Sequence, residues 1–253
     1  MNKERLRLKL ISCEVLARQA YYAAAFSPHV VDIVLIDKGL HREPDSLRNH
    51  LQEQIDAIQP GKYDALILGY GLCSNSIVGL SCPHTRIIVP RAHDCITLYL
   101  GSRERYAQEF RKNPGTYWYT ADYIERGGTE GDAIPLGATA DDADMATVYE
   151  EYVQKYGKDN ADYLMEVMGA WKKHYSRAAY IEPKELRLPD YKEQVRGVAA
   201  RRGWEFSLLA GSLLLIRDLV EGNWDDERFL VVPPGHSIVP MYDDRIITAA
   251  PQR

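Results

Sequence analysis

Three cysteines stand where short aliphatic runs end, and this placement is the first chemical feature of the sequence. Cys13, Cys73 and Cys95 each lie at or just after such a run. In an open parallel sheet, the loops after the carboxyl ends of the strands line one crevice, and ligands bind there. We therefore expect these thiols to converge, and His41, from the end of a further strand, could join them. Cys82 precedes a run instead of following one, so we place it at the opposite edge of the sheet.

Convergent thiols predict a transition-metal site. Soft thiolates select zinc or an iron–sulfur cluster, and three protein ligands leave a fourth position open for water or substrate, as in catalytic zinc sites. Helical patterns begin close to Cys13 and Cys95, and the N–H groups of a helix N-terminus favour a thiolate. The sequence contains no CxxC pair. Free cysteine also packs as a small buried hydrophobe, so buried thiols without a metal remain the alternative.

The segment IIVPRAHDCITLYLGSRERY, residues 87–106, places several reactive side chains around Cys95. His93 could be a proton shuttle, a fourth metal ligand or a structural histidine. Asp94 precedes a helical pattern, which favours a helix cap over a catalyst. Arg91 and Arg103 could bind a substrate carboxylate or phosphate through paired N–H groups.

Strand and helix signals alternate through the first half of the chain. Aliphatic runs at 6–12, 30–37, 63–68 and 86–89 predict strands, with helices at 14–26 and from residue 43 onward. Continuous apolar strands that alternate with helices indicate a parallel sheet covered on both faces. We therefore predict an α/β fold, with a mainly parallel, doubly wound, Rossmann-like sheet in the first half and a second α/β unit. The stripe that predicts the second helix is Leu47, Leu51, Ile55 and Ile58, at the 3.6-residue period.

The composition changes after the aromatic stretch that begins at Pro114. Glycine and aspartate are frequent in residues 129–144, which we interpret as an acidic linker or insertion. The predicted division is an N-terminal α/β unit at 1–128 that carries the Cys/His site, the segment 129–144, and a third part at 145–253. That last part shows helical patterns at 145–153, 164–171 and 190–202 and strand signals at 179–181, 205–209 and 229–232.

Global composition excludes several classes of function. Of the 253 residues, 45% are hydrophobic and 26% charged, as in ordinary globular proteins. The net charge of −5 argues against a nucleic acid or an anionic membrane as partner. No apolar run approaches the roughly 20 residues that span a bilayer, and the N-terminus shows no signal-peptide pattern. We expect a cytoplasmic protein whose four cysteines are thiols or metal ligands and not disulfides.

Longer stretches of the chain resemble a known family. LGYGLCSNSIVGL, VPRAHDCITLYLGSRERY, PGTYWYTADYIERG and LVEGNWDDERFLVVPPGHSI are similar to the prokaryotic family catalogued as domain of unknown function 1638. Because its members often lie near genes for corrinoid-dependent methyltransferases, the resemblance implies anaerobic one-carbon or thiol metabolism. Residues 132–144 resemble an insertion of this member. The matching positions are Cys13, Gly71, Cys73, Asn75, Arg91, His93, Asp94, Cys95, Gly101, Ser102, Arg103, Tyr106, Pro114, Gly115, Thr116 and Tyr117.

The leading hypothesis is a metal-dependent enzyme, a transferase or lyase, with its metal on Cys13, Cys73 and Cys95. Zinc is favoured, because a zinc-bound substrate thiol becomes a thiolate, the nucleophile for methyl or alkyl transfer. A four-iron four-sulfur cluster on the same cysteines is one alternative. Others are a non-catalytic carrier of a metal or corrinoid for a partner methyltransferase, and a plain ligand-binding α/β module. The expected catalytic residues are His93 and Arg91, and a small-molecule substrate would contact Tyr70, Gly71, Asn75, Arg103, Tyr106 and Tyr117.

Overall fold

The computed structural model describes residues 5–127, 153, 158 and 175–252, without the side chain of Arg42. The chain divides into two compact units. The first comprises Met1–Tyr106, Pro183–Arg187 and Gly211–Arg253, and the second comprises Ala107–Glu182 and Leu188–Ala210. The C-terminal part of the chain therefore returns to the first unit. The predicted linker at 129–144, the helix at 164–171 and nearly all of that at 145–153 lie outside the described residues.

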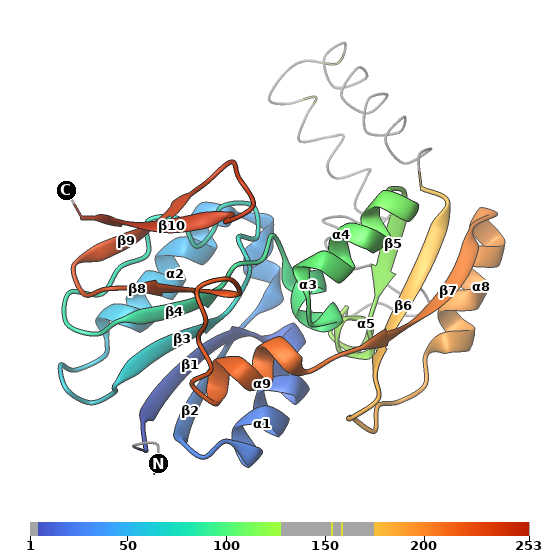
Figure 1. Cartoon of the computed structure of the whole chain (residues 1–253). Coiled ribbons are helices and arrows are strands. Elements are labelled where there is room, and N and C mark those ends of the chain that lie inside the picture. The colour runs from blue at the N-terminus through green and yellow to red at the C-terminus, as the bar shows by residue number, and fades with distance from the viewer. Residues whose placement is uncertain (1–4, 128–152, 154–157, 159–174, 253) are drawn as a thin grey trace. The chain divides into compact units, whose positions relative to one another are not determined.

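A five-stranded sheet forms the centre of the first unit, in the order β2-β1-β3-β4-β8 (Figure 1). β1 runs parallel to β2 and β3, and β3 runs parallel to β4. β8 comes from the C-terminal part of the chain and pairs with β4 in antiparallel orientation. The predicted mainly parallel α/β sheet is confirmed. The strands are β1 (Arg7–Cys13), β2 (Val30–Ile36), β3 (Ala65–Gly69), β4 (Ile87–Pro90) and β8 (Phe229–Val232).

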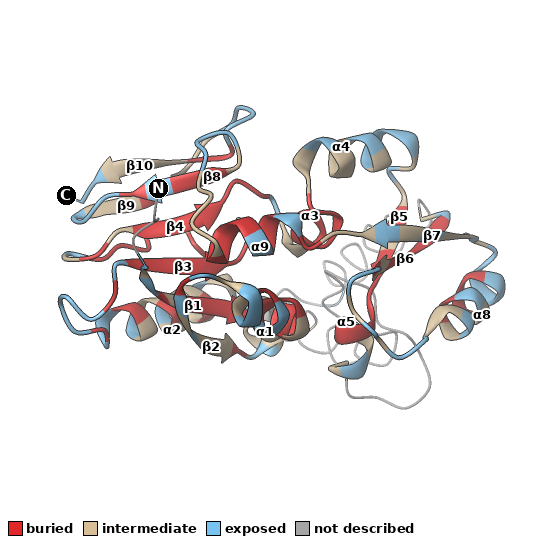
Figure 2. Cartoon of the chain, turned by 60° about the horizontal axis from the view of Figure 1, so that its bottom comes forward, coloured by how far each residue is buried: buried red, intermediate tan, exposed pale blue. Residues whose placement is uncertain are grey.

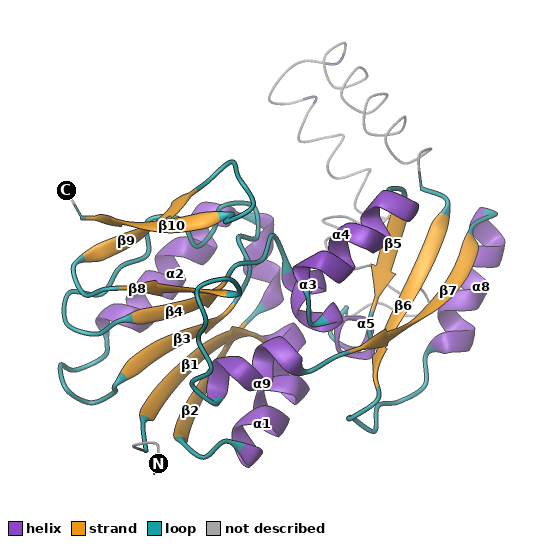
Figure 3. Cartoon of the chain, viewed as in Figure 1, coloured by secondary structure: helices purple, strands orange, loops and turns teal. Residues whose placement is uncertain are grey.

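Helices cover both faces of this sheet (Figure 3). The chain steps from β1 to β2 in one direction and from β2 to β3 in the other. Because such crossovers are right-handed, α1 and α2 lie on opposite faces, and α9 packs beside α1. Within the described ranges, no helix combines the length and apolar character needed to cross a membrane. The elements are η1 (Glu14–Leu16), α1 (Ala17–Phe26), η2 (Lys38–Arg42), α2 (Pro44–Asp56) and α9 (Leu214–Val220).

The core of the first unit is built on β1, β3 and β4 (Figure 2). Every residue of β3 and β4 is buried, and α2 buries Leu47, Leu51 and Ile55 of its predicted stripe. The edge strand β2 buries only Ile36. Because burial of an aliphatic side chain contributes about 1.5–3 kcal/mol, packing fixes the three central strands most firmly. The loops that follow them are therefore presented by a rigid frame.

Several elements of the first unit were not predicted. An antiparallel hairpin near the C-terminus pairs β9 with β10. Two helices follow β4. The first, α3 (Cys95–Leu100), is the helix predicted to begin near Cys95, whereas the second, α4 (Arg103–Lys112), was not predicted and leads into the other unit. The strands of the hairpin are β9 (His236–Pro240) and β10 (Ile247–Pro251).

The second unit has its own three-stranded sheet, in the order β5-β6-β7. The aromatic stretch after Pro114 forms β5, which runs parallel to β6. One face is covered by α8, where Tyr119, Tyr180, Val195 and Val198 form a buried cluster. The second α/β unit is thus present, with one strand supplied from before residue 128. Its elements are β5 (Thr116–Tyr119), α5 (Ala121–Glu125), β6 (Arg177–Pro183), α8 (Lys192–Arg202) and β7 (Glu205–Gly211).

Candidate functional site

The ends of β1 and β3 lie against each other and bring Cys13 to the carboxyl edge of the sheet. Ser12 and Gly69 are partners in the parallel ladder, and the Ser12 hydroxyl donates to the Gly69 carbonyl at 3.4 Å. A Cβ at Gly69 would lie 2.7 Å from the Ser12 Cβ. Only glycine allows this approach. Cys13 and Tyr70, the next residues of the two strands, therefore leave the sheet close together.

The segments after β3 and β4 continue side by side beyond the sheet. The N–H of Leu72 donates to the Ala92 carbonyl at 2.7 Å, and the N–H of Cys73 donates to the His93 carbonyl at 2.9 Å. At Gly71 an added Cβ would lie 2.7 Å from the backbone nitrogen of Asp94. These main-chain contacts place Cys73 beside the segment that carries Cys95.

A strained turn follows immediately. Cys73, Ser74 and Asn75 have φ values of 44°, 56° and 66°, in the left-handed region. This conformation costs an L-residue roughly 1–2 kcal/mol, and such strain persists at sites where the surroundings enforce it. Here the Asn75 carbonyl accepts a hydrogen bond from Arg48 Nη2 at 2.9 Å, and the N–H of Ser76 donates to the Cys73 carbonyl at 3.1 Å.

Asp94 caps α3, as the sequence predicted. Its Oδ1 accepts from the N–H groups of Ile96 at 3.0 Å and Thr97 at 3.3 Å. The Tyr106 hydroxyl donates to Oδ2 at 3.3 Å, so this tyrosine, expected to contact substrate, contacts the cap. Burial raises the pKa of the Asp94 carboxyl, and these three hydrogen bonds oppose the shift.

The three cysteines lie within electrostatic reach of one another. Burial raises the pKa of the Cys73 thiol, and the charges of Asp94 and Cys13 raise it further. Burial also raises the pKa of Cys95 well above its usual value, and Cys73, Asp94 and Cys13 add to the shift. Backbone N–H groups lower both pKa values but do not outweigh burial and like charge. The backbone N–H groups thus favour the thiolates in the expected direction, and burial with like charge favours the protonated thiols more strongly in the metal-free protein.

Tyr70 adds a buried hydroxyl beside the thiols. Its side chain is 1% exposed, and among the described residues the hydroxyl has no hydrogen-bond partner. Burial raises the pKa of Tyr70 well above its usual value, and the charges of Cys13, Cys73, Glu14 and Cys95 add to this. The phenol is thus held in its protonated form.

His41, in η2, stacks on Tyr70. The ring centroids are 5.9 Å apart and the planes are inclined by 22°. Its Nε2 is buried and finds no partner in the described part of the chain. Burial lowers the pKa of His41, so the imidazole is neutral at physiological pH. His41, which follows β2, is therefore connected to the site through its ring contact with Tyr70.

Further buried polar groups without partners occur in the segments that follow the central strands. Gln19, Ser76 and Thr97 are each at most 1% exposed, yet their side-chain polar atoms make no hydrogen bond within the described ranges. Buried polar groups are normally paired with protein, water or an ion. These segments follow Cys13, Cys73 and Cys95. Buried polar groups without a described hydrogen-bond partner therefore lie close in sequence to each of the three thiols.

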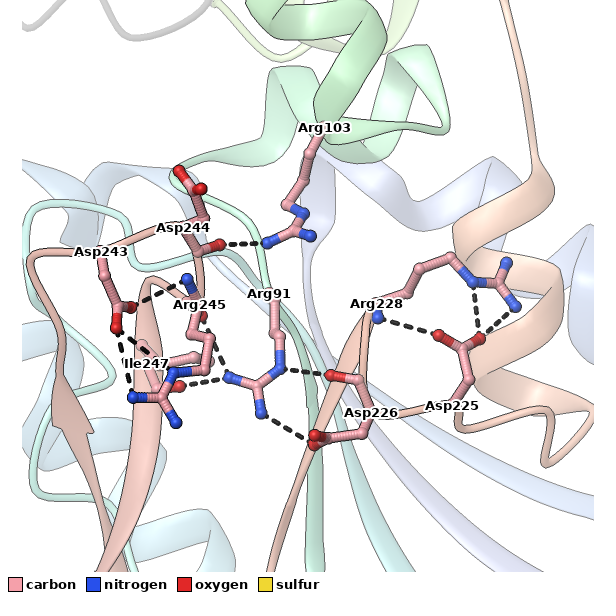
Figure 4. A network of polar contacts seen from close by, with 9 residues as sticks. All are labelled: Arg91, Arg103, Asp225, Asp226, Arg228, Asp243, Asp244, Arg245 and Ile247. Carbon is pink, nitrogen blue, oxygen red and sulfur yellow. Dashed lines mark hydrogen bonds and ion pairs between the residues drawn. The ribbon is translucent and has the colours of Figure 1, made fainter.

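Arg91 has a different environment from the one expected (Figure 4). Its guanidinium is 5% exposed. Nε donates to the Asp226 carbonyl at 2.8 Å, and Nη2 pairs with the Asp226 carboxylate at 2.9 Å. Nη1 donates to the carbonyls of Arg245, at 3.1 Å, and Ile247. Arg91 thus clamps the end of β4 to the segments before β8 and β10, and these contacts give no support to a role in substrate binding.

The other predicted residues are spread over different surroundings. Arg103 Nη1 donates to the Asp244 carbonyl (Figure 4). His93 is exposed, and its charge lowers the pKa of Asp94 slightly against the effect of burial. Asn75 is exposed on the strained turn. Tyr117 belongs to the second unit, where it stacks on Trp204 with ring centroids 5.0 Å apart.

Cys82 precedes β4, whereas the other cysteines follow strand ends. Its Sγ lies 3.7 Å from Nδ1 of His84, and its carbonyl accepts from the N–H of Gly235 at 3.0 Å. Its side chain is 1% exposed. These contacts agree with a structural thiol outside the candidate site.

Glu14 is a neighbour of the site that the sequence analysis did not single out. Its Oε1 accepts from the N–H of Lys38 at 3.1 Å, and its charge acts on Tyr70. Its position directly after Cys13 was the available signal. Among the described residues, no group of three or more His, Cys, Asp and Glu side chains is arranged so that it could hold a metal ion.

A shallow groove lies elsewhere in the first unit. Residues of α1, β2 and the turn before β3 line it, among them Tyr21, Asp32 and Tyr63, and it contains none of the cysteines. The groove is thus separate from the thiol-bearing strand ends.

Comparison with known proteins identifies the family. A family model described as "Protein of unknown function (DUF1638)" matches residues 35–220, a range that includes Cys73 and Cys95 and begins after Cys13. No curated protein and no solved structure matches the chain. The family match covers well over half of the sequence, and the chain therefore belongs to the DUF1638 family.

Proposed function

We propose that the protein is a metal-dependent enzyme in which Cys13, Cys73 and Cys95 hold one zinc ion and leave a fourth position open to a small-molecule substrate. The observation that carries this proposal is the convergence of three thiols from three strand ends into electrostatic reach of one another. Soft thiolates favour zinc. Three protein ligands with one open position form the usual catalytic arrangement.

The electrostatics of the site support the binding of a cation. Burial and like charge keep Cys73 and Cys95 protonated in the metal-free protein. A divalent cation would replace these protons and relieve the repulsion among the thiolates and Asp94. Because the side chains are not arranged for a metal, binding requires the thiols to rotate into other staggered positions. We therefore expect metal binding to be coupled to a local rearrangement at the turn that begins at Cys73.

The chemistry that such a site favours is alkyl transfer to a thiol. A substrate thiol in the open position loses its proton, and its sulfur lone pair forms a bond to the methyl or alkyl carbon of a donor. The bond from that carbon to its leaving group breaks, and the electron pair departs with the leaving group. His93 is exposed next to Asp94, and we assign it the thiol proton. The donor would be a small molecule or the alkylated corrinoid of a partner protein.

Metal content tests the proposal. The protein is purified under anaerobic conditions, and its metals and visible spectrum are measured for the wild type and for Cys13→Ser, Cys73→Ser, Cys95→Ser and the matched control Cys82→Ser. We expect a colourless wild type with about one zinc per chain. Each variant of the three site cysteines should lose the metal, because two thiolates do not hold it against buffer. Cys82→Ser should retain it.

Other outcomes would change the assignment. A brown protein with about four irons would favour the four-iron four-sulfur cluster on the same cysteines. A metal that passes to a partner methyltransferase, without turnover of thiols and alkyl donors, would favour the carrier function. His93→Ala should retain the metal if the imidazole is a proton shuttle. No metal under any condition, or equal metal content in Cys95→Ser and Cys82→Ser, would refute the site.

A further inference from the structure

We propose that the edge strand β2 and the exposed aromatic residues of α1 bind a second copy of this chain, by antiparallel pairing of β2 with itself about a two-fold axis at Ile33. The proposal is independent of the cysteine site and concerns only the first unit. β2 stands at one end of the five-stranded sheet, so one side of this strand has no neighbouring strand (Figure 1). At the other end of the sheet, β10 packs against β8. The described chain therefore covers one edge of the sheet and leaves the edge at β2 open.

The backbone of β2 gives the first observation. The N–H of Val30 donates to the Leu6 carbonyl, just before β1, at 2.9 Å. Because successive residues of a strand direct their hydrogen-bonding groups to opposite sides, Val31, Ile33 and Leu35 direct theirs to the open edge. Within the described ranges, these groups have no backbone partner. The strand contains neither lysine nor proline, which protect many natural edge strands from pairing.

The exposed aromatic residues of α1 lie beside this edge. Tyr21 is 56% exposed and lines the shallow groove together with Val31 and Ile33 of β2. On the same helix, the rings of Tyr22 and Phe26 contact each other with centroids 4.9 Å apart, and Phe26 is 70% exposed. Clustered exposed apolar surface of this kind marks interaction sites. The helix and the strand edge together thus form one candidate interface.

A two-fold axis perpendicular to the sheet uses both features at once. It pairs β2 with itself in antiparallel orientation and places the two copies of α1 side by side on the same face of the joined sheet. With the axis at Ile33, all seven residues of the strand pair, and Val31 lies opposite Leu35 of the second copy. Groups that point to the open edge then meet each other. An axis at Asp32 would place two carboxylates opposite each other, and an axis at Val34 would shorten the pairing.

The charges near the edge also suit a second copy. Asp32 is the register partner of Lys9 in β1, and its carboxylate accepts from the Tyr63 hydroxyl at 2.7 Å. The ammonium groups of Lys9 and Lys62 lie 5.9 Å and 5.5 Å from the centroid of the Tyr63 ring. Each copy therefore brings cations and an anion to the interface. With the axis at Ile33, each Asp32 lies opposite an aliphatic side chain and keeps its own lysine beside it.

The available area requires that both elements take part. The exposed fractions of Tyr21, Tyr22 and Phe26 correspond to roughly 250–400 Å² per copy. A stable interface buries about 800 Å² per partner. The strand and the groove have to supply the remainder, so we expect a dimer that is held at both elements and has a micromolar dissociation constant.

Sedimentation equilibrium of the full chain tests the interface. We expect the wild type to be a dimer at about 100 μM, above the micromolar range of weak interfaces, and to dissociate on dilution. Ile33→Lys places two ammonium groups at the axis, and Tyr21→Ala removes the ring beside it. Each should raise the dissociation constant at least about tenfold, which corresponds to about 1.4 kcal/mol. The matched controls are Leu208→Lys, at a 51% exposed position of the edge strand β7, and Tyr242→Ala, at a fully exposed position, and both should dimerise as the wild type does.

Chemical cross-linking tests the register. With the axis at Ile33, the two copies of residue 33 face each other with Cα atoms about 5.5 Å apart. The two copies of residue 30 lie about 20 Å apart along the paired strands. A short bismaleimide should therefore join Ile33→Cys into covalent dimers and fail to join Val30→Cys, although Val30 is the more exposed position. The wild type, with its own four cysteines, gives the background.

Each contrary result would overturn the proposal. A wild type that stays monomeric at about 100 μM, where even a weak interface of this kind forms, would exclude a second copy as the partner of this edge. A dimer that both Ile33→Lys and Tyr21→Ala leave intact would use another surface. Equal cross-linking of Ile33→Cys and Val30→Cys would refute the antiparallel register. If Ile33→Lys does not fold, as circular dichroism would show, Tyr21→Ala and the cross-linking of Ile33→Cys decide.

Discussion

The backbone N–H of Cys73 donates a hydrogen bond to the carbonyl of His93 at 2.9 Å. This bond continues the parallel pairing of β3 and β4 past the last residues of both strands. The candidate site is thus positioned by main-chain contacts, which tolerate less change than contacts between flexible side chains. Substitutions that separate the two segments should therefore change the positions of the cysteines, although the cysteines themselves are not replaced.

Gly71→Ala is the sharpest substitution of this kind. Its new Cβ would lie 2.7 Å from the Asp94 nitrogen and 2.9 Å from the Ala92 carbonyl oxygen, and both atoms are backbone. We expect the free energy of unfolding to fall by about 1–3 kcal/mol and metal retention to fall with it. Urea unfolding and metal analysis measure both effects.

Gly197→Ala in α8 is the matched control. The nearest atom to its new Cβ is Arg201 Nη1 at 3.6 Å, the end of a flexible side chain. Alanine is favoured over glycine in a helix by about 1 kcal/mol, so this variant should gain stability and keep its metal. A Gly71→Ala protein as stable as the wild type would contradict the close approach at Asp94.

The metal-free protein should lose stability as the pH rises above the ordinary thiol pKa of about 8.5. The pKa values of Cys73 and Cys95 are raised in the folded state. Below the unfolded pKa both states bind the proton, and the stability is fully present. Above it only the unfolded chain releases the proton, so the free energy of unfolding falls by up to about 1.4 kcal/mol per pH unit and thiol.

Urea unfolding at about pH 7.5 and about pH 9.5, on either side of that pKa, measures this slope. The double variant Cys73→Ala/Cys95→Ala should show a flatter pH dependence, since other titrating groups are the same in both proteins. Metal-loaded protein should show the reverse trend, because its thiols have already released their protons. Equal slopes for the wild type and the double variant would mean that the thiols are not shifted.

Arg91→Met should affect stability and leave the metal site intact. The substitution removes the Arg91 donor from the carbonyls of Arg245 and Ile247, of which the first still accepts from the Ile247 N–H, and it breaks the pair with Asp226. We expect a loss of about 2–4 kcal/mol, less than for a fully buried ion pair, because the Asp226 side chain is 90% exposed. Arg103→Met is the milder control. If Arg91→Met were as stable as the wild type but failed to bind substrate, the expectation from the sequence would be restored.

The strands that lead to the cysteines could be predicted from the sequence, since continuous aliphatic runs are a local pattern. The 3.6-residue stripe predicted α2 for the same reason. It could not assign β8 to the first sheet, because an apolar run does not specify its partner. The environment of Arg91 could not be predicted from the sequence either. The residue type suggests anion binding, whereas its actual acceptors come from segments near residues 226 and 245, which only the tertiary fold brings together. The unpaired hydroxyl of Tyr70 likewise emerges only from packing.

Asp94→Asn separates the two effects of this residue. Asparagine caps a helix about as well as aspartate, so the hydrogen bonds to Ile96 and Thr97 and the stability should be preserved. The negative charge, which raises the pKa values of Cys73 and Cys95, is removed. Both thiols should therefore titrate at lower pH in the metal-free variant.

Alkylation by iodoacetamide as a function of pH, followed by mass spectrometry, measures this shift because only the thiolate reacts. The midpoints for Cys73 and Cys95 should move down, whereas Cys82, which is 1% exposed and contacts His84, should react as slowly as before. Asp94→Ala removes the charge and the cap together, and should also lose about 1 kcal/mol of stability. If the midpoints of Asp94→Asn equal those of the wild type, the Asp94 charge does not act on the thiols, and the electrostatic case for a cation at this site rests on burial and on the other cysteines.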